Sequence, residues 1–171
     1  MVYSVYKTDA FATNLITGIY QDSSLAKLYK NLISAQAGTS YIADAALFEE
    51  KYTMFIGAPI YEGSTLIGML AYQLPLDIIN SIMAERTGQG LTGESFLLAM
   101  DEDGRISYRN NRTSLGNEKF ILGYDITDIA SPTMRKALAG ESGGGLVAAS
   151  TGETRINAYS PLEIEGLNWV V

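Results

Sequence analysis

The sequence contains no cysteine and no histidine among its 171 residues. Without these residue types the chain has no thiol nucleophile, no Ser-His-Asp triad, no usual ligand set for structural zinc, and no His or Cys to hold haem. Catalysis would have to use carboxylate, lysine, tyrosine or serine groups, and the sequence shows no convincing pair of acid and base. We therefore expect no enzymatic activity, no bound metal and no cofactor.

The chain is also short of positive charge and of long apolar runs. Its 12 lysines and arginines stand against 19 acidic residues, and the net charge of −7 argues against a surface that follows nucleic-acid phosphates. The longest apolar stretch, residues 65–76, is interrupted by Gly68, Gln73 and Pro75 and falls short of the roughly 18 residues of a membrane span. We expect no nucleic-acid partner and no membrane-spanning helix within this stretch of sequence.

Hydrophobic residues make up 47% of the chain, which is typical of a folded globular protein. Residues 25–33 carry apolar side chains at helical spacing, directly after the N-cap candidates Asp22 and Ser23. A turn at Gly63 predicts a hairpin between two of the strands that follow. The strand-like runs of this half are residues 41–48, 52–61 and 65–74.

A helix over residues 76–85 is predicted after Pro75, a residue that the first helical position tolerates. Its apolar stripe of Ile79, Ile82 and Met83 is expected to pack inward, with polar residues such as Asn80 facing solvent. This helix would connect the two halves. In the second half a helix is predicted that Ser131 and Pro132 begin and Gly140 ends. Strands are predicted at 96–100, 105–109, 146–150, 155–162 and 167–171.

The two halves repeat each other. Pro59 and Pro161 stand 102 positions apart in similar segments, and a second match places Ser4 against Ser107. Each half is interpreted as strand, loop, helix and three antiparallel strands. Nothing in the first half corresponds to residues 95–104, so we expect the first module to begin upstream of Met1.

Several segments resemble the double Cache extracytoplasmic sensor domains of bacterial chemoreceptors and related receptors. They are Gly57–Ile60, Leu66–Leu70, Gln73–Leu76, Thr92–Leu97 and Asn157–Leu162. The resemblance implies an α+β fold with two tandem PAS-like modules, each an antiparallel sheet flanked by helices. It also implies the domain boundaries: an incomplete membrane-distal module at 1–75, a connecting helix and turn at 76–94, and a membrane-proximal module at 95–171.

The same resemblance implies a function. It implies a periplasmic or extracellular domain of a receptor that is anchored in the inner membrane. The domain would sense an amino acid, an amine or a small organic acid, and the full receptor would be a homodimer. A chemoreceptor is the first interpretation; the sensor of a histidine kinase or diguanylate cyclase is the second. A structural dimerisation module is the third, because the second half, with Arg105, Arg109 and Arg112, shows no obvious pocket residues.

The first half supplies the candidate ligand-binding residues. Asp44 stands in an otherwise apolar run, where a charge is out of keeping unless it lies in a turn or binds something. In amino-acid-sensing relatives an aspartate on the matching strand accepts the ligand ammonium, which implies that role for Asp44. Tyr6, Tyr29, Tyr41 and Tyr72 are expected to supply walls and hydroxyl groups, with Tyr41 and Tyr72 reaching the same cavity as Asp44.

Two glycine-rich segments are interpreted as structural. The run Gly88–Gly93 has the letters of the dinucleotide-binding GxGxxG motif, but a helix precedes it and a strand follows, which reverses the required order. It is expected to form a turn between the modules. The run Gly143–Gly145 lacks the Lys-Ser/Thr of a phosphate-binding loop and is expected to separate a strand from the preceding helix.

Overall fold

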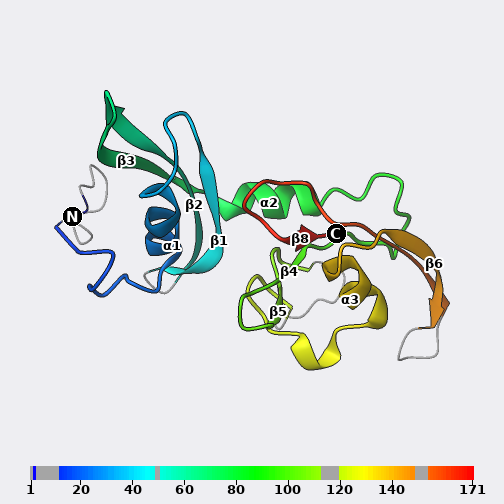
Figure 1. The fold of residues 1–171 in the computed structure, drawn as a ribbon. Coiled ribbons are helices and arrows are strands. Elements are labelled where there is room, and N and C mark those ends of the chain that lie inside the picture. Colours follow the sequence, from blue (N-terminus) through cyan, green and yellow to red (C-terminus); the bar gives the residue numbers. More distant parts are fainter. Residues whose placement is uncertain (1, 3–11, 49–50, 113–119, 149–153) are drawn as a thin grey trace. The chain divides into compact units, whose positions relative to one another are not determined.

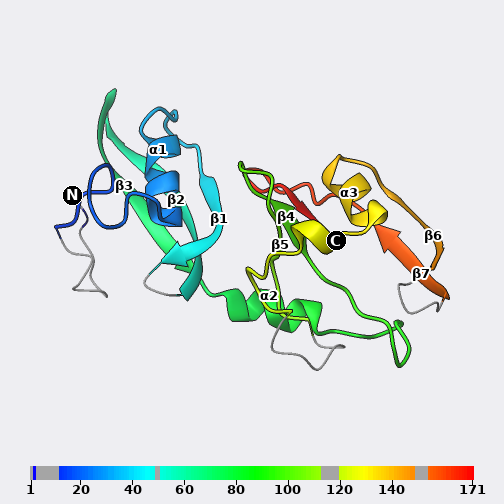
Figure 2. The same ribbon diagram turned by 90° about the horizontal axis from the view of Figure 1, so that it is seen from below.

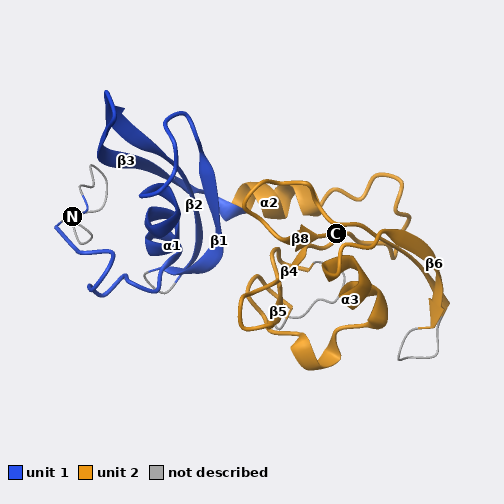
Figure 3. Cartoon of the chain, viewed as in Figure 1, with its two compact units in different colours: residues 1–76 blue, residues 77–171 orange. Residues whose placement is uncertain are grey.

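The computed structural model describes residues 2, 12–48, 51–112, 120–148 and 154–171. The chain divides into two compact units, Met1–Leu76 and Asp77–Val171 (Figure 3). Both units combine antiparallel strands with helices, so the predicted α+β class is confirmed. No helix in the described part of the chain is long and apolar enough to span a membrane.

The described residues of unit 1 form a three-stranded antiparallel sheet with one helix against it. The strands are in the order β1-β2-β3, and α1 lies on one face of the sheet (Figures 1 and 2). The elements are α1 (Ser24–Leu32), β1 (Tyr41–Phe48), β2 (Lys51–Glu62) and β3 (Thr65–Leu74). Each agrees with a run predicted from the sequence, because each run has its own local signal of period, cap or turn.

Helix α1 is placed by its cap and by its apolar face. The side chain of Ser23 accepts a hydrogen bond from the backbone N–H of Ala26 at 3.2 Å, which satisfies one donor of the first turn. Leu28 and Leu32 are almost fully buried against the sheet. A Cβ at Gly57 would lie 2.9 Å from Leu28 Cδ2, so the helix can approach β2 this closely only because position 57 is glycine.

Unit 2 contains more and shorter elements than unit 1. Strands β5-β4-β8 form one antiparallel sheet and β6-β7 form a hairpin, and a bridge between Pro161 and Val170 connects the chain after β7 to β8. The elements are α2 (Leu76–Met83), β4 (Leu98–Met100), β5 (Ile106–Tyr108), a 3₁₀ turn (Thr127–Ile129), α3 (Pro132–Leu138), β6 (Gly143–Ala148), β7 (Thr154–Tyr159) and β8 (Trp169–Val170).

The core of unit 2 lies where α3 packs on the sheet. Leu98, Ile106 and Val170 are buried together with Ala137 and Leu138 of α3. The helix begins as its sequence predicted, with Ser131 as N-cap and proline at the first helical position. Trp169, the only tryptophan of the chain, is 3% exposed in β8.

The predicted inward packing of the α2 stripe is wrong. No residue of α2 is buried, and Ile82 is 65% exposed. Asn80, which was expected to face solvent, instead accepts a hydrogen bond from the backbone N–H of Asn111 at 2.7 Å. The periodicity identified the apolar face of the helix correctly, but period alone does not say whether anything covers that face.

The run Gly143–Gly145 also differs from its interpretation, since β6 begins at Gly143 and includes all three glycines. Gly143 pairs with Tyr159 and Gly144 with Ala158. A Cβ at Gly143 would lie 2.8 Å from the hydroxyl of Tyr159. Gly143 and Gly144 therefore make room for the partner strand and its tyrosine ring rather than separating β6 from α3.

Candidate functional site

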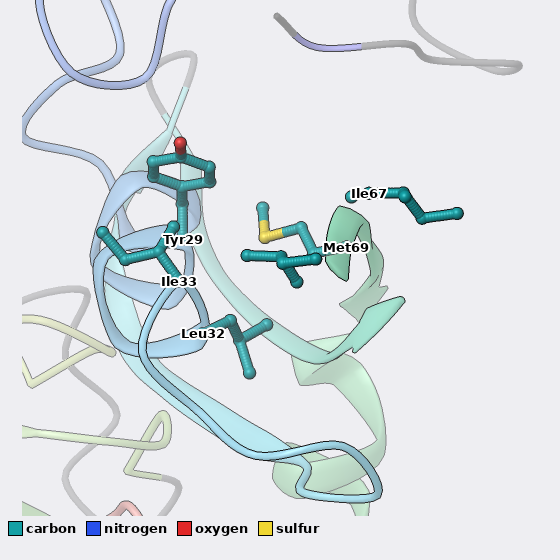
Figure 4. A pocket seen from close by; sticks show the side chains of 7 residues that line it. Tyr29, Leu32, Ile33, Ile67 and Met69 are labelled. Carbon is teal, nitrogen blue, oxygen red and sulfur yellow. The ribbon is translucent and has the colours of Figure 1, made fainter. Parts of the chain in front are cut away.

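A cavity of about 180 Å³ lies in unit 1 between α1 and β3 (Figure 4). In the close-up, Tyr29 and Leu32 of α1 face Met69 of β3 across the same space. The residues that line it are Tyr29, Leu32, Ile33, Leu66, Ile67, Gly68 and Met69. The Tyr29 hydroxyl is the one polar side-chain group in this set, so the cavity suits a small apolar group and offers no charged anchor.

The predicted tyrosines fall into different places. Tyr29 lines the cavity, and Tyr41 packs against the core beneath α1. Tyr41 pairs with Gly57 across the sheet, whereas Tyr72 pairs with Ile56. Because neighbouring positions on a strand point to opposite faces, Tyr72 lies on the face away from Tyr41, where it is 64% exposed. The expectation that Tyr41 and Tyr72 reach one cavity is therefore wrong.

Asp44 occupies a β-bulge. The pairing of β1 with β2 shifts between Ala43 and Ala46, and Asp44 is half-buried within that shift. Its Oδ1 accepts a hydrogen bond from the backbone N–H of Ala45 at 2.6 Å. The bulge gives a local reason for a charge in an apolar strand, and Asp44 lines neither cavity described in this structure. Its role in ligand binding stays a prediction, and Tyr6 lies outside the described residues.

Unit 2 holds a larger cavity, of about 1110 Å³, that the sequence did not predict. The loop between α2 and β4 forms one wall and carries Arg86, Gln89 and Glu94 into the lining. Arg112 and residues of β4, α3, β6, β7 and β8 also line the cavity. The sequence showed no obvious pocket residues in this half, and the structure places a cavity there. Most of the lining residues come from distant parts of the sequence, so apart from the glycine run at 88–93 no local spacing marked them.

The GxGxxG run was the one available signal for this site. Gly88 and Gly90 have φ angles of +80° and +68°, in the region that glycine favours. A Cβ at Gly93 would lie 2.3 Å from the carbonyl oxygen of Gln89, so that position also requires glycine. The three glycines allow a tightly turned loop that forms a cavity wall.

A buried ion pair and an aromatic surface meet in the lining of this cavity. The guanidinium of Arg112 pairs with the carboxylate of Glu94, and their side chains are 13% and 6% exposed. The same guanidinium lies over the ring of Phe96, 4.5 Å from its centroid, and donates to the hydroxyl of Tyr108 at 3.1 Å. Stacking and pairing together hold Arg112 in one orientation.

No model of a protein family matches the sequence, and a search of curated proteins finds no significant relative. Solved structures do match. The ligand-binding domain of the Pseudomonas fluorescens chemoreceptor CtaA, in complex with L-isoleucine, is 17% identical with a TM-score of 0.52, covering 84% of this chain and 53% of that domain. The periplasmic sensory domain of the Campylobacter jejuni chemoreceptor Tlp1 is 19% identical with a TM-score of 0.55, covering 83% and 51%. This chain shares the fold of these two sensory domains.

The sensory-domain fold extends beyond chemoreceptors. The extracellular domain of mmHK1S-Z2, described as a histidine kinase, has a TM-score of 0.56 at 14% identity and covers 92% of this chain and 59% of its own. The chain thus spans between about half and three-fifths of the length of these domains. The predicted resemblance to receptor sensory domains is confirmed at the level of an α+β fold with antiparallel sheets and helices.

Proposed function

We propose that the chain is a small-molecule sensor domain of a transmembrane receptor, with a chemoreceptor as the preferred parent. The observation that carries the proposal is the shared fold: sensory and ligand-binding domains of receptors match this chain over 83% to 92% of its length. A ligand-binding role also fits a sequence without histidine, cysteine or a catalytic acid–base pair, so we propose a domain that binds without catalysis.

The proposed arrangement is two tandem modules, at residues 1–75 and 95–171, joined by the segment 76–94. In the parent receptor the first module would be membrane-distal and the second membrane-proximal, outside the inner membrane, within a homodimer. Ligand binding would favour one of two conformations by its difference in affinity for them, and the attached membrane segments would report the shift.

Amino acids are the first ligands to test, with amines and small organic acids next. The solved neighbours include a CtaA complex with L-isoleucine and a Pseudomonas aeruginosa PctB complex with L-Gln. In unit 1 we propose that Asp44 accepts the ligand ammonium, with Tyr29 and Tyr41 on the α1 side of the sheet. This assignment requires β1 to rearrange at its bulge, since Asp44 does not line the cavity beside Tyr29.

A thermal-shift screen of amino acids, amines and small carboxylates tests the function. A ligand present at 100 times its dissociation constant should add about 2.7 kcal/mol to the free energy of unfolding. Asp44→Asn should then weaken binding by about 1.5 to 3 kcal/mol, the range for a hydrogen bond to a charged group. Asp22→Asn, the same charge change at an exposed position, is the control. A domain that no ligand stabilises would instead be a structural dimerisation module.

The match to mmHK1S-Z2 favours a histidine kinase as the second candidate parent. The two parents are distinguished by their output in the full-length protein. Ligand-dependent autophosphorylation would identify the kinase, whereas a ligand-dependent change in swimming behaviour would identify the chemoreceptor.

A further inference from the structure

Strand β3 forms one edge of the sheet of unit 1. It pairs with β2 on one side, and within the described residues no strand pairs with its other side. Its ten residues, Thr65–Leu74, include no charged residue and no proline. Sheet edges are normally protected by charge, proline or a bulge, and the opposite edge of the same sheet has such protection, since β1 carries the Asp44 carboxylate at its bulge. The edge of β3 is therefore open to pairing with another strand.

Unit 2 shows what covers the corresponding edge there. Pro161 lies opposite Val170 on one side, and Leu98 of β4 lies opposite Val170 on the other. In unit 1, Pro59 lies opposite Met69 in the same way. The two prolines are 102 positions apart, and Met69 and Val170 are 101 apart. Among the described residues of unit 1, Met69 thus faces a counterpart of Pro161 but none of Leu98.

The backbone of Met69 is oriented to pair with such a strand. In unit 2, Ser160 and Val171 exchange both of their backbone hydrogen bonds, at 3.0 and 2.9 Å. The alternation along an antiparallel strand therefore turns the N–H and C=O of Val170 toward β4. Proline has no N–H to exchange with the residue opposite it, and the same alternation directs the N–H and C=O of Met69 away from Pro59, to the open edge.

The cavity beside Tyr29 lies at this edge of the sheet (Figure 4). Its lining comes from α1, from the C-cap residue Ile33 and from β3, and it includes no residue of β2. Ile33 and Ile67 are 46% and 59% exposed, so this part of the lining is accessible. In unit 2 the corresponding place is filled, since Leu98 is buried with Leu138 of α3. The volume of about 180 Å³ compares with roughly 150 Å³ for a cavity that takes up benzene, so one apolar side chain fits.

We propose that the open edge of β3 is the docking site of a further strand, which runs antiparallel to β3 and places a leucine-sized apolar side chain in the cavity beside Tyr29. The strand is a segment of the same polypeptide. The offset between Met69 and Val170 puts the counterpart of Leu98 upstream of Met1, where the repeat predicts the opening strand of this module. The proposal rests on the two-module arrangement of the proposed function and goes beyond it, because it gives the cavity an occupant from the protein itself.

A disulfide cross-link to a synthetic peptide tests the site and its register on the whole chain, which contains no cysteine of its own. The peptide has the sequence of residues 95–101, which include β4, with Ala99→Cys. Ala99 lies opposite Trp169, and the counterpart of Trp169 in β3 is Gly68. A side chain added at Gly68 meets open space, so Gly68→Cys should leave the fold intact. Opposite residues of antiparallel strands lie about 4.5 to 5.5 Å apart, a distance that a disulfide spans.

In a buffer of reduced and oxidised glutathione, we expect Gly68→Cys to form the mixed disulfide about 10-fold faster than Gly145→Cys, since docking raises the effective concentration of the peptide thiol. Gly145 is the matched control because it is an exposed strand glycine with equally open surroundings, in β6 of unit 2. A peptide that also carries Leu98→Asp should lose this advantage, because a carboxylate is costly to bury in an apolar cavity. The neighbouring change Leu97→Asp lies on the other face of the strand and should keep it.

Three results would overturn the proposal. They are equal rates at the two cysteines, a Leu98→Asp peptide that reacts as fast as its parent, and a disulfide between two copies of Gly68→Cys that forms in preference to the mixed one. The last would make the edge an interface between copies of the chain.

Ile67→Lys gives a test that needs no engineered cysteine in the chain. It places a charge at the open edge and should weaken binding of the fluorescein-labelled peptide about 10-fold, measured by anisotropy. Leu47→Lys, on β1 at 58% exposure, is the control and should bind as the parent does. Equal weakening in both variants would contradict the site. Asp44→Asn should leave peptide binding unchanged, so failure of the proposed ligand site and failure of the strand site give different results.

Discussion

The two units differ in the length of their strands and in the kinds of side chain that they bury. In unit 1, strands of up to 12 residues and a closely packed helix surround an apolar core. Among the residues of this unit that the structure describes, the buried polar ones are the hydroxyl-bearing Ser23, Ser24 and Thr53. In unit 2 the strands have two to six residues, and Arg109 and Asn110 are 5% and 1% exposed. Among the described residues, unit 2 therefore buries a charged and an amide side chain beside its apolar core, which unit 1 does not.

This difference indicates which unit can bind a polar molecule. Unit 1 satisfies its buried hydroxyls internally; Ser24 Oγ, for example, donates to the carbonyl oxygen of Thr53 at 3.0 Å. Its cavity is small and apolar. Unit 2 leaves polar atoms of Arg86 and Gln89 without a hydrogen-bond partner among the described residues, and its cavity is larger. Apolar packing makes up most of the interior of unit 1, whereas unit 2 has polar side chains in its interior as well.

The largest effect is expected from Leu28→Ala in unit 1. Leu28 is fully buried between α1 and β2, so its truncation leaves a cavity and should lower the free energy of unfolding by about 2 to 5 kcal/mol. Urea denaturation followed by circular dichroism measures the loss. Leu47→Ala, at a position that is 58% exposed, is the matched control. Equal losses in the two variants would show that unit 1 is not held by its apolar core.

A smaller effect is expected from Asn110→Ala in unit 2. Asn110 Oδ1 accepts from the backbone N–H of Leu97 at 2.6 Å, and its amide donates to the carbonyl oxygen of Asn111 at 3.0 Å. The substitution leaves the backbone N–H of Leu97 without its acceptor and should reduce the free energy of unfolding by about 1 to 3 kcal/mol. The exposed Asn31→Ala serves as its control in the same urea experiment. An unchanged midpoint for Asn110→Ala would contradict the view that unit 2 depends on buried polar groups.

Acid should weaken unit 2 through Asp101. Burial alone would raise the pKa of this carboxyl group, but hydrogen bonds from the backbone N–H and guanidinium of Arg105 outweigh it and lower the pKa. Because the folded pKa lies below the unfolded one, the stabilisation is present above about pH 4 and is lost as pH falls through the folded pKa.

Asp101→Asn should remove this contribution to the acid dependence, with a loss at neutral pH below about 1 kcal/mol because the partner side chain, Arg105, is 66% exposed. The melting temperature of the parent and of Asp101→Asn, measured as a function of pH, tests this prediction. Glu102→Gln, at the exposed neighbouring position, is the control. A parent and an Asp101→Asn variant with the same slope in acid would exclude Asp101 as the source.

The smallest effect is expected at the start of unit 2. Ile82 is 65% exposed on α2, so Ile82→Ala should change the free energy of unfolding by no more than about 0.5 kcal/mol. Urea denaturation at low protein concentration is the measurement. A loss of 2 kcal/mol or more would mean that another surface covers the apolar face of α2 in solution.

The elements with local signals could be predicted from the sequence. Helix α1 had an N-cap and a stripe of leucines, and the β2–β3 hairpin had a glycine turn, so both were found at nearly their observed bounds. The orientation of Tyr72 was missed because it depends on strand register, which no residue near Tyr72 specifies. The cavity of unit 2 was missed because its lining is assembled from Arg86 to Val171 by tertiary contacts.

Trp169 gives unit 2 an optical signal of its own. As the single tryptophan of the chain, buried in β8 at 3% exposure, it should emit at short wavelength in the folded state and shift to longer wavelength when unit 2 opens to water. Circular dichroism reports the strands and helices of both units at once. If the fluorescence and dichroism curves of one denaturation coincide, the units unfold as one cooperative body; if they separate, each unit has its own folding equilibrium.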